Sequence, residues 1–233
     1  MSLRARLLGT LADRLAAQPA APALRVAVDG VDGAGKTTFA DELAEVLRNR
    51  GRTVIRASID GFHAPRDVRY RRGRASPEGF YRDSYDLEGL RSALLDPLGP
   101  GGSGRYRTAT FDHTTDLPVR EPEQVALPGT VLIVDGLFLH RPEVRDVWDD
   151  SVFLRVPFTV SVPRGAARGP GYGSPDSHAE SNRRYVQGNR LYFREADPER
   201  HAGVVVDNSD LAAPFFVRLS PGKAPREATS PAG

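Results

Sequence analysis

The residues best suited to chemistry lie at positions 30–37, where the sequence follows the spacing G-x-x-x-x-G-K-T. Its glycines allow a tight turn that brings backbone N–H groups close to a polyphosphate. Lys36 can neutralise the terminal phosphates, and the Thr37 hydroxyl is a suitable ligand for Mg²⁺. A glycine-rich turn that binds nothing is the alternative, but such a chance match between a strand and a helix is rare. We therefore predict a phosphate-binding loop with contacts from Gly30, Asp32, Gly33, Ala34, Gly35, Lys36, Thr37 and Thr38.

Two more segments would bring carboxylates to this loop. The apolar stretch 53–58 precedes Asp60, and the run 130–134 precedes Asp135. Both are predicted to be buried parallel strands, and ligands bind at the carboxyl edge of such a sheet. Asp60 could accept the proton of an attacking alcohol, and Asp135 could help Thr37 to hold Mg²⁺. The alternative for Asp60 is that it caps a turn or binds Mg²⁺ through water. The alternative for Asp135 is that its buried strand simply ends in Asp-Gly.

Alternating helices and strands are predicted to position these residues. Apolar residues at helical spacing indicate helices over 3–17, 36–50, 86–95 and 179–196, and a short helix at 142–148. Further strands are expected at 24–28, 105–111, 151–156 and 201–206. Residues 64–85 and 96–104 are predicted to be irregular. This alternation indicates an α/β fold with three layers and a mostly parallel central sheet.

Composition narrows the class of protein. The 233 residues, with 39% hydrophobic and 27% charged, suit one α/β domain. Because 32 basic residues are balanced by 30 acidic ones, a nucleic-acid partner is not expected. No apolar run is long enough to span a bilayer, so we expect a cytoplasmic protein without membrane contact. The absence of cysteine excludes disulfides and thiolate metal sites, and self-association is left open.

Two further groups of residues are predicted to take part in phosphoryl transfer, a pair of arginines and a set of residues that bind the acceptor. Arg164 and Arg168 stand four apart, which places them on one side of a helix, where they could neutralise charge on a transferred phosphoryl group. The surrounding segment, about 162–182, is rich in Gly, Pro and Ser and predicts a small lid, with disorder as the alternative.

Aromatic rings interleaved with Arg and Asp suit a small polar acceptor, although a solvated loop would look similar. The acceptor candidates are Phe62, His63, Phe80, Tyr81, Arg82 and Asp83.

Together these motifs resemble the uridine kinase and phosphoribulokinase group of P-loop kinases, over about residues 24–210. The resemblance rests on the phosphate loop, on Asp60-Gly61-Phe62-His63, on Phe111-Asp112 where uridine kinases have Tyr-Asp, on Asp135-Gly136, and on the two arginines. It implies a P-loop NTPase fold, ATP as donor, Asp60 as base, and Mg²⁺ arranged by Thr37 and Asp135. It also implies catalytic roles for Lys36, Arg164 and Arg168, and acceptor contacts from Phe111 and Asp112. Asp116 stands where a histidine that contacts the base would be expected.

We predict an ATP-dependent kinase that phosphorylates a primary hydroxyl of a small molecule, with uridine or cytidine as the first candidate acceptor. Pantothenate or a sugar is the alternative acceptor, because the Asp-Gly-Phe-His element also resembles related kinases of those compounds. A nucleotide-dependent switch or accessory NTPase is the alternative of another class. The expected organisation is a helix and connector at 1–22, the kinase domain at 23–219, and a disordered tail at 220–233.

Overall fold

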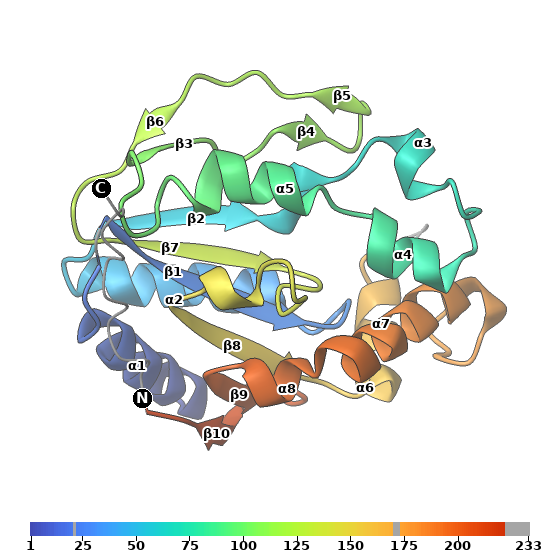
Figure 1. The fold of residues 1–233 in the computed structure, drawn as a ribbon. Helices are drawn as coiled ribbons and strands as arrows, with labels where there is room; N and C mark the ends of the chain where they lie inside the picture. Colours follow the sequence, from blue (N-terminus) through green and yellow to red (C-terminus); the bar gives the residue numbers. More distant parts are fainter. Residues whose placement is uncertain (21, 170–172, 222–233) are drawn as a thin grey trace.

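The computed structural model describes residues 1–20, 22–169 and 173–221, and its centre is a six-stranded sheet (Figure 1). The strand order is β10-β9-β8-β1-β7-β2. Five strands are parallel, namely β1 (Ala23–Gly30), β2 (Val54–Ser58), β7 (Thr130–Gly136), β8 (Asp150–Arg155) and β9 (Val204–Asp207). The last strand, β10 (Phe215–Leu219), runs antiparallel to β9. This confirms the α/β class and the mostly parallel sheet.

Helices cover both faces of the sheet and complete the three layers. On one face, α1 (Leu3–Ala16) and α2 (Lys36–Asn49) bury Leu11 and Leu43 against Val28 and Ile133. The opposite face carries α4 (Pro77–Asp83), α5 (Leu87–Leu90), the π-helical turn η2 (Arg91–Leu95) and α7 (Arg183–Ala196). All residues of β1 and β7 are buried, as their apolar sequences predict. The sheet is therefore held between two apolar layers.

The helices predicted at 3–17 and 36–50 form with recognisable ends, whereas the short helix predicted at 142–148 is only a 3₁₀ turn at Arg145–Val147. The hydroxyl of Ser2 caps α1 by accepting from the backbone N–H of Ala5 at 3.1 Å. Helix α2 begins directly after Gly35, and Gly51, with a φ of 78°, follows its last turn. Among the described residues, no helix is both long and apolar enough to cross a lipid bilayer.

The prediction that residues 64–85 are irregular is wrong, because the segment contains α3 (Arg66–Arg69) and α4. Ser76 caps α4 through the backbone N–H of Gly79 at 3.0 Å, and Pro77 occupies its first position, which are both helix-start signals. The single strand predicted at 105–111 is two short ones, β3 (Arg105–Tyr106) paired with β6 (Gln124–Val125), and β4 (Phe111–Asp112) paired with β5 (Leu117–Pro118).

The remaining elements connect β2, β7, β8 and β9 to the helical layers. They are the 3₁₀ turns η1 (Ile59–Phe62), η3 (Arg145–Val147) and η4 (Glu180–Asn182), and the helices α6 (Phe158–Ala166) and α8 (Pro198–His201). The antiparallel strand β10 has no counterpart in the sequence prediction. Of the tail predicted at 220–233, residues 222–233 lie outside the described residues, as do residues 170–172 of the predicted lid.

Candidate active site

The phosphate loop joins β1 to α2 at the carboxyl edge of the sheet. Gly33 and Gly35 have φ values of 73° and 85°, a left-handed conformation that glycine adopts without strain. The Nζ of Lys36 donates to the carbonyl oxygen of Val31, 2.9 Å away, within the loop. Burial lowers the pKa of Lys36, and the nearby carboxylates, first that of Asp32, oppose the shift. The loop thus combines the backbone shape and the cation that a polyphosphate requires.

The predicted loop residues take different positions around a cleft of about 340 Å³. Five of them line it, namely Asp32, Gly33, Gly35, Lys36 and Thr37. Gly30 and Ala34 are buried beneath, and the carbonyl of Ala34 accepts from Asn208 at 2.8 Å. Thr38 is exposed in the first turn of α2. The loop thus contributes to the cleft wall from Asp32 to Thr37, with Ala34 turned inward.

Thr37 and Asp135 meet at the tips of two neighbouring elements. The Thr37 hydroxyl donates to Oδ2 of Asp135 at 2.7 Å, while Arg56 holds Oδ1 at 2.8 Å. The Asp135 side chain is only 4% exposed, so the arginine compensates a buried charge. This pair supplies only oxygen donors, which Mg²⁺ prefers, and Mg²⁺ usually takes one or two protein carboxylates besides the phosphates of its substrate. The donor set therefore fits Mg²⁺.

Asp60 lies in the same cleft, on the turn η1 after β2. β2 is separated from β1 by β7, but the register aligns Ser58 and Val28 with the same residue, Asp135. The tips of the three strands are therefore level. The Asp60 side chain is 61% exposed, and the Tyr85 hydroxyl donates to its Oδ1 at 3.4 Å. A carboxylate with an accessible oxygen thus shares the cleft with the phosphate loop.

Aromatic side chains from distant segments line the cleft beside Asp60. The imidazoles of His63 and His113 are stacked with centroids 4.6 Å apart, and Tyr85 packs on His63 at 4.7 Å. The Nδ1 of His63 lies 2.9 Å from the carbonyl oxygen of Asp60 and donates to it, which leaves Nε2 as an acceptor. Burial lowers the pKa of His63. Phe80 and Tyr185 line the same cleft.

Of the predicted acceptor residues, only His63 and Phe80 line this cleft, and the others are corrected. Tyr81 packs in the core against Phe138, because α4 turns successive side chains to different sides. Asp83 is bound by Arg71 and Arg72. The other four predicted acceptor residues also lie outside the cleft. Phe62 and Phe111 are buried, and Arg82 pairs with Glu78 and Glu195. Asp112 caps the turn at Thr114 and Thr115.

The two lid arginines also take separate places. Arg168 lines the cleft, whereas Arg164 donates to the backbone carbonyls of Asn208 and Ser209, so the predicted pairing of the two arginines at the phosphates is corrected. The reason is that α6 ends at Ala166, before Arg168, and the four-residue spacing no longer sets a common face. α6 also rests directly on the phosphate loop, since a Cβ built on Gly33 would lie 2.1 Å from the carbonyl oxygen of Ser161.

Comparison with known families decides the identity of this site. The model of the phosphoribulokinase / uridine kinase family matches residues 26–168, more than half of the chain. The chain belongs to this family. The matched part of this P-loop kinase contains the phosphate loop, Asp60, Asp135 and both lid arginines. The resemblance inferred from the sequence is thereby confirmed.

Individual relatives of the kinase are distant. Thymidylate kinase from Xanthomonas campestris pv. campestris is 26% identical over 188 residues, which are 80% of this chain and 76% of the relative. The solved structure of a possible uridine kinase from Bacillus stearothermophilus shares the fold with a TM-score of 0.66 and 24% identity, over 86% of this chain and 97% of the other. A proposed fructose transport system kinase from Silicibacter sp. TM1040 has a TM-score of 0.62 and 27% identity, over 84% and 96%.

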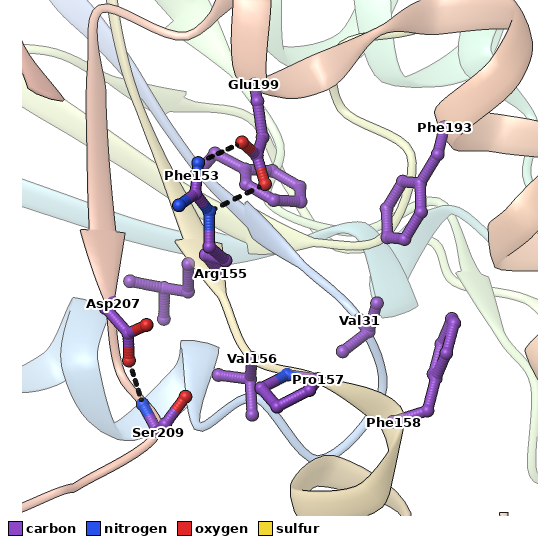
Figure 2. A pocket seen from close by; sticks show the side chains of 11 residues that line it. Val31, Phe153, Arg155, Val156, Pro157, Phe158, Phe193, Glu199, Asp207 and Ser209 are labelled. Atoms are coloured by element: carbon purple, nitrogen blue, oxygen red, sulfur yellow. Dashed lines mark hydrogen bonds and ion pairs between the residues drawn. The ribbon is translucent and has the colours of Figure 1, made fainter. Parts of the chain in front are cut away.

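A second hollow of about 380 Å³ lies on the other side of Val31, where α6, α7 and α8 meet the ends of β8 and β9 (Figure 2). Phe158 and Phe193 line it with nearly parallel rings 6.1 Å apart. Its charged groups are engaged with protein partners, since Arg155 pairs with Glu199 and Asp207 accepts from the backbone N–H of Ser209. This hollow lacks the loop lysine and Asp60, which both line the cleft.

Three further side chains that line the cleft, those of Tyr85, His113 and Tyr185, are not among the predicted site residues. No metal-ligand spacing surrounds His113, so its sequence context gives no local signal of a site. Tyr85 reaches the cleft through the His63–Tyr85 bridge, a tertiary pairing that leaves no local signal in the sequence. Tyr185 carries no local signal, because α7 is amphipathic over its whole length.

Proposed function

We propose that this kinase transfers the γ-phosphoryl group of ATP to a primary hydroxyl of a small molecule, with uridine or cytidine as the first candidate acceptor. The observation that carries the proposal is that Asp60 lines the same cleft as Lys36 and Thr37. A carboxylate beside a phosphate loop can act on an alcohol that attacks the terminal phosphate. Family membership supports phosphoryl transfer and leaves the acceptor to be identified by experiment.

In the proposed reaction Asp60 accepts the hydroxyl proton while the acceptor oxygen bonds to the γ-phosphorus. The bond from that phosphorus to the β–γ bridging oxygen breaks, and ADP leaves. Lys36 and Arg168 neutralise negative charge on the transferred group, which is the main electrostatic contribution in such reactions. Mg²⁺ held by Thr37 and Asp135 would supply further positive charge at the phosphates. Stacked aromatic walls would orient the acceptor and exclude water.

A sugar is the second candidate acceptor. The Nε2 of His63 is an acceptor, because Nδ1 donates to the Asp60 carbonyl, and it can therefore receive a hydrogen bond from a sugar hydroxyl. The 27% identical protein proposed to be a fructose transport system kinase also favours this class.

A panel of acceptors assayed with ATP and MgCl₂ tests the proposal. Uridine, cytidine, fructose and pantothenate are each incubated with the kinase, and the phosphorylated product is detected by its added mass. We expect one acceptor class to be converted at a rate at least about 10²-fold above the others. ATP hydrolysis that no acceptor accelerates, with no product of added mass, would instead favour a nucleotide-dependent switch.

A further inference from the structure

A buried chain of polar side chains runs from the start of the phosphate loop into the sheet. Asp29, the residue before Gly30, is completely buried. Its Oδ1 accepts from the backbone N–H of Gly30 at 2.7 Å, and its Oδ2 accepts from the backbone N–H of His140 at 3.2 Å and from Nδ1 of the same histidine at 2.7 Å. The Tyr192 hydroxyl also donates to Oδ2. Four donors thus fix one carboxylate at the entrance of the loop.

The partners of His140 define its tautomer. A carboxylate only accepts, so Nδ1 of His140 carries the proton that it donates to Asp29. Nε2 lies 3.0 Å from the hydroxyl of Ser151, whose oxygen accepts from the backbone N–H of Gly203 at 3.2 Å. The hydroxyl proton can therefore point at Nε2, and each polar side-chain atom of Asp29, His140 and Ser151 has a hydrogen-bond partner. Ser151 is 2% exposed and His140 is 1% exposed, so no substrate reaches this Ser-His-Asp sequence and it does not act as a nucleophile.

The same helix that meets Asp29 also holds the loop at a second point. Asn189 and Tyr192 stand three apart on α7 and are both buried. The Nδ2 of Asn189 donates to Oδ2 of Asp32 at 3.2 Å. α7 therefore binds the carboxylates on either side of the first loop glycine. It also contributes Tyr185 to the cleft, so one rigid element contacts both the phosphate loop and the cleft wall.

Gly30 begins the loop in close contact with β8. Its φ is 153°, and a Cβ built there would lie 2.8 Å from the carbonyl oxygen of Leu154, so the loop begins pressed against β8. The bond from Gly30 N–H to Asp29 fixes the loop at this contact, and it depends on a carboxylate whose orientation His140 and Tyr192 fix.

We propose that His140 is a positioning residue of the phosphate loop. It holds Asp29 so that the carboxylate fixes Gly30 N–H and Tyr192 together, which sets the loop against α7 in the conformation that grips a polyphosphate. His140 acts through Asp29 and does not contact the nucleotide. The inference rests on the proposed function only in that the loop binds a nucleotide. Neither the identity of the acceptor nor the role of Asp60 enters it.

Two substitutions at His140 separate positioning from plain structural support. His140→Asn retains an amide N–H within reach of Asp29, whereas His140→Leu has a similar volume and no donor. Calorimetric titration with MgADP gives the dissociation constant of each variant, and thermal unfolding gives its stability. We expect His140→Leu to raise the dissociation constant by about 10-fold or more, and His140→Asn to stay within about 3-fold of the wild type. Tyr106→Phe, which removes a hydroxyl bonded to Gln124 away from the loop, is the control for a lost tyrosine hydrogen bond and should leave MgADP binding unchanged.

Equal dissociation constants for His140→Leu and the wild type, measured below both unfolding temperatures, would overturn the inference and leave His140 a structural residue. Should His140→Leu fail to fold, Tyr192→Phe removes a single hydroxyl from Asp29 and keeps the ring in the core. We expect it to weaken MgADP binding by about 3-fold or more, and unchanged binding would again contradict the proposal. A wild-type protein that binds no MgADP would refute the nucleotide assignment itself.

Discussion

Substitution of Gly33 by alanine should separate α6 from the phosphate loop. The new Cβ would lie 2.1 Å from the carbonyl oxygen of Ser161, and 3.1 Å from the backbone nitrogen of Gly165. Both neighbours are backbone atoms of α6 and cannot rotate away. The helix would have to retreat by about 1 Å to restore an ordinary van der Waals contact. We therefore expect the variant to fold with α6 displaced and the loop poorly covered.

The magnitude follows from two contributions. A left-handed φ of 73° costs a non-glycine residue about 1 kcal/mol, and overpacking against backbone adds about 1–3 kcal/mol. Nucleotide binding requires the loop conformation that is packed under α6. Most of the combined free-energy cost should therefore appear as weaker binding of MgADP. A total of about 2–4 kcal/mol corresponds to a dissociation constant for MgADP that is raised by about 30-fold or more.

Gly101→Ala is the matched control, because Gly101 has a φ of 74° and a Cβ there would meet nothing within 4 Å. It carries the same backbone cost without the collision. The control should lose about 1 kcal/mol of unfolding free energy in urea titrations and keep its MgADP affinity. If Gly33→Ala binds MgADP as tightly as Gly101→Ala does, the close seating of α6 on the loop is refuted.

Three further predictions concern charges around the cleft. Arg168→Gln should lower the turnover number by about 10²-fold, measured at saturating ATP and acceptor, because a cation that faces the transferred group is lost, and an unchanged turnover would remove Arg168 from the mechanism. Burial lowers the pKa of His63, so the unfolded chain binds a proton there more readily and stability falls as the pH drops below about 6.5. His63→Gln should flatten that dependence between pH 7 and pH 5 in urea titrations, and an unaltered slope would contradict the assignment. Arg56→Met leaves one oxygen of Asp135 without its cation and should lower the unfolding free energy by about 3 kcal/mol, whereas a stability equal to the wild type would show that the pair is dispensable.

The phosphate loop and the strand before Asp135 could be predicted because their signals are local. The glycines, Lys36 and Thr37 occupy fixed positions in eight residues, and four consecutive apolar residues place Asp135 at the tip of a buried strand. Local spacing also gave α1 and α2. In each case the pattern that determines the structure lies within one element, and tertiary contacts reinforce it.

The cleft walls could not be predicted because they join segments that are distant in sequence. β7 lies between β1 and β2 in the sheet, so Asp60 reaches the loop from one strand further away than the order along the chain indicates. The missed cap at Ser76 concealed α4, and only its helical rotation explains why Phe80 lines the cleft while Tyr81 does not. His113 reaches His63 through the short pairing of β4 with β5, whose two-residue strands leave little trace in hydropathy.

The measurement that tests the account most directly compares Asp60→Asn with Asp67→Asn, an exposed carboxylate on α3 outside the cleft. Both variants are assayed for MgADP affinity and for phosphorylation of the acceptor that the wild type converts. We predict that Asp60→Asn keeps the MgADP dissociation constant within about 3-fold and lowers acceptor phosphorylation by about 10²-fold or more, while Asp67→Asn matches the wild type in both. Phosphorylation by Asp60→Asn at the wild-type rate would contradict the proposed role of Asp60 as the base.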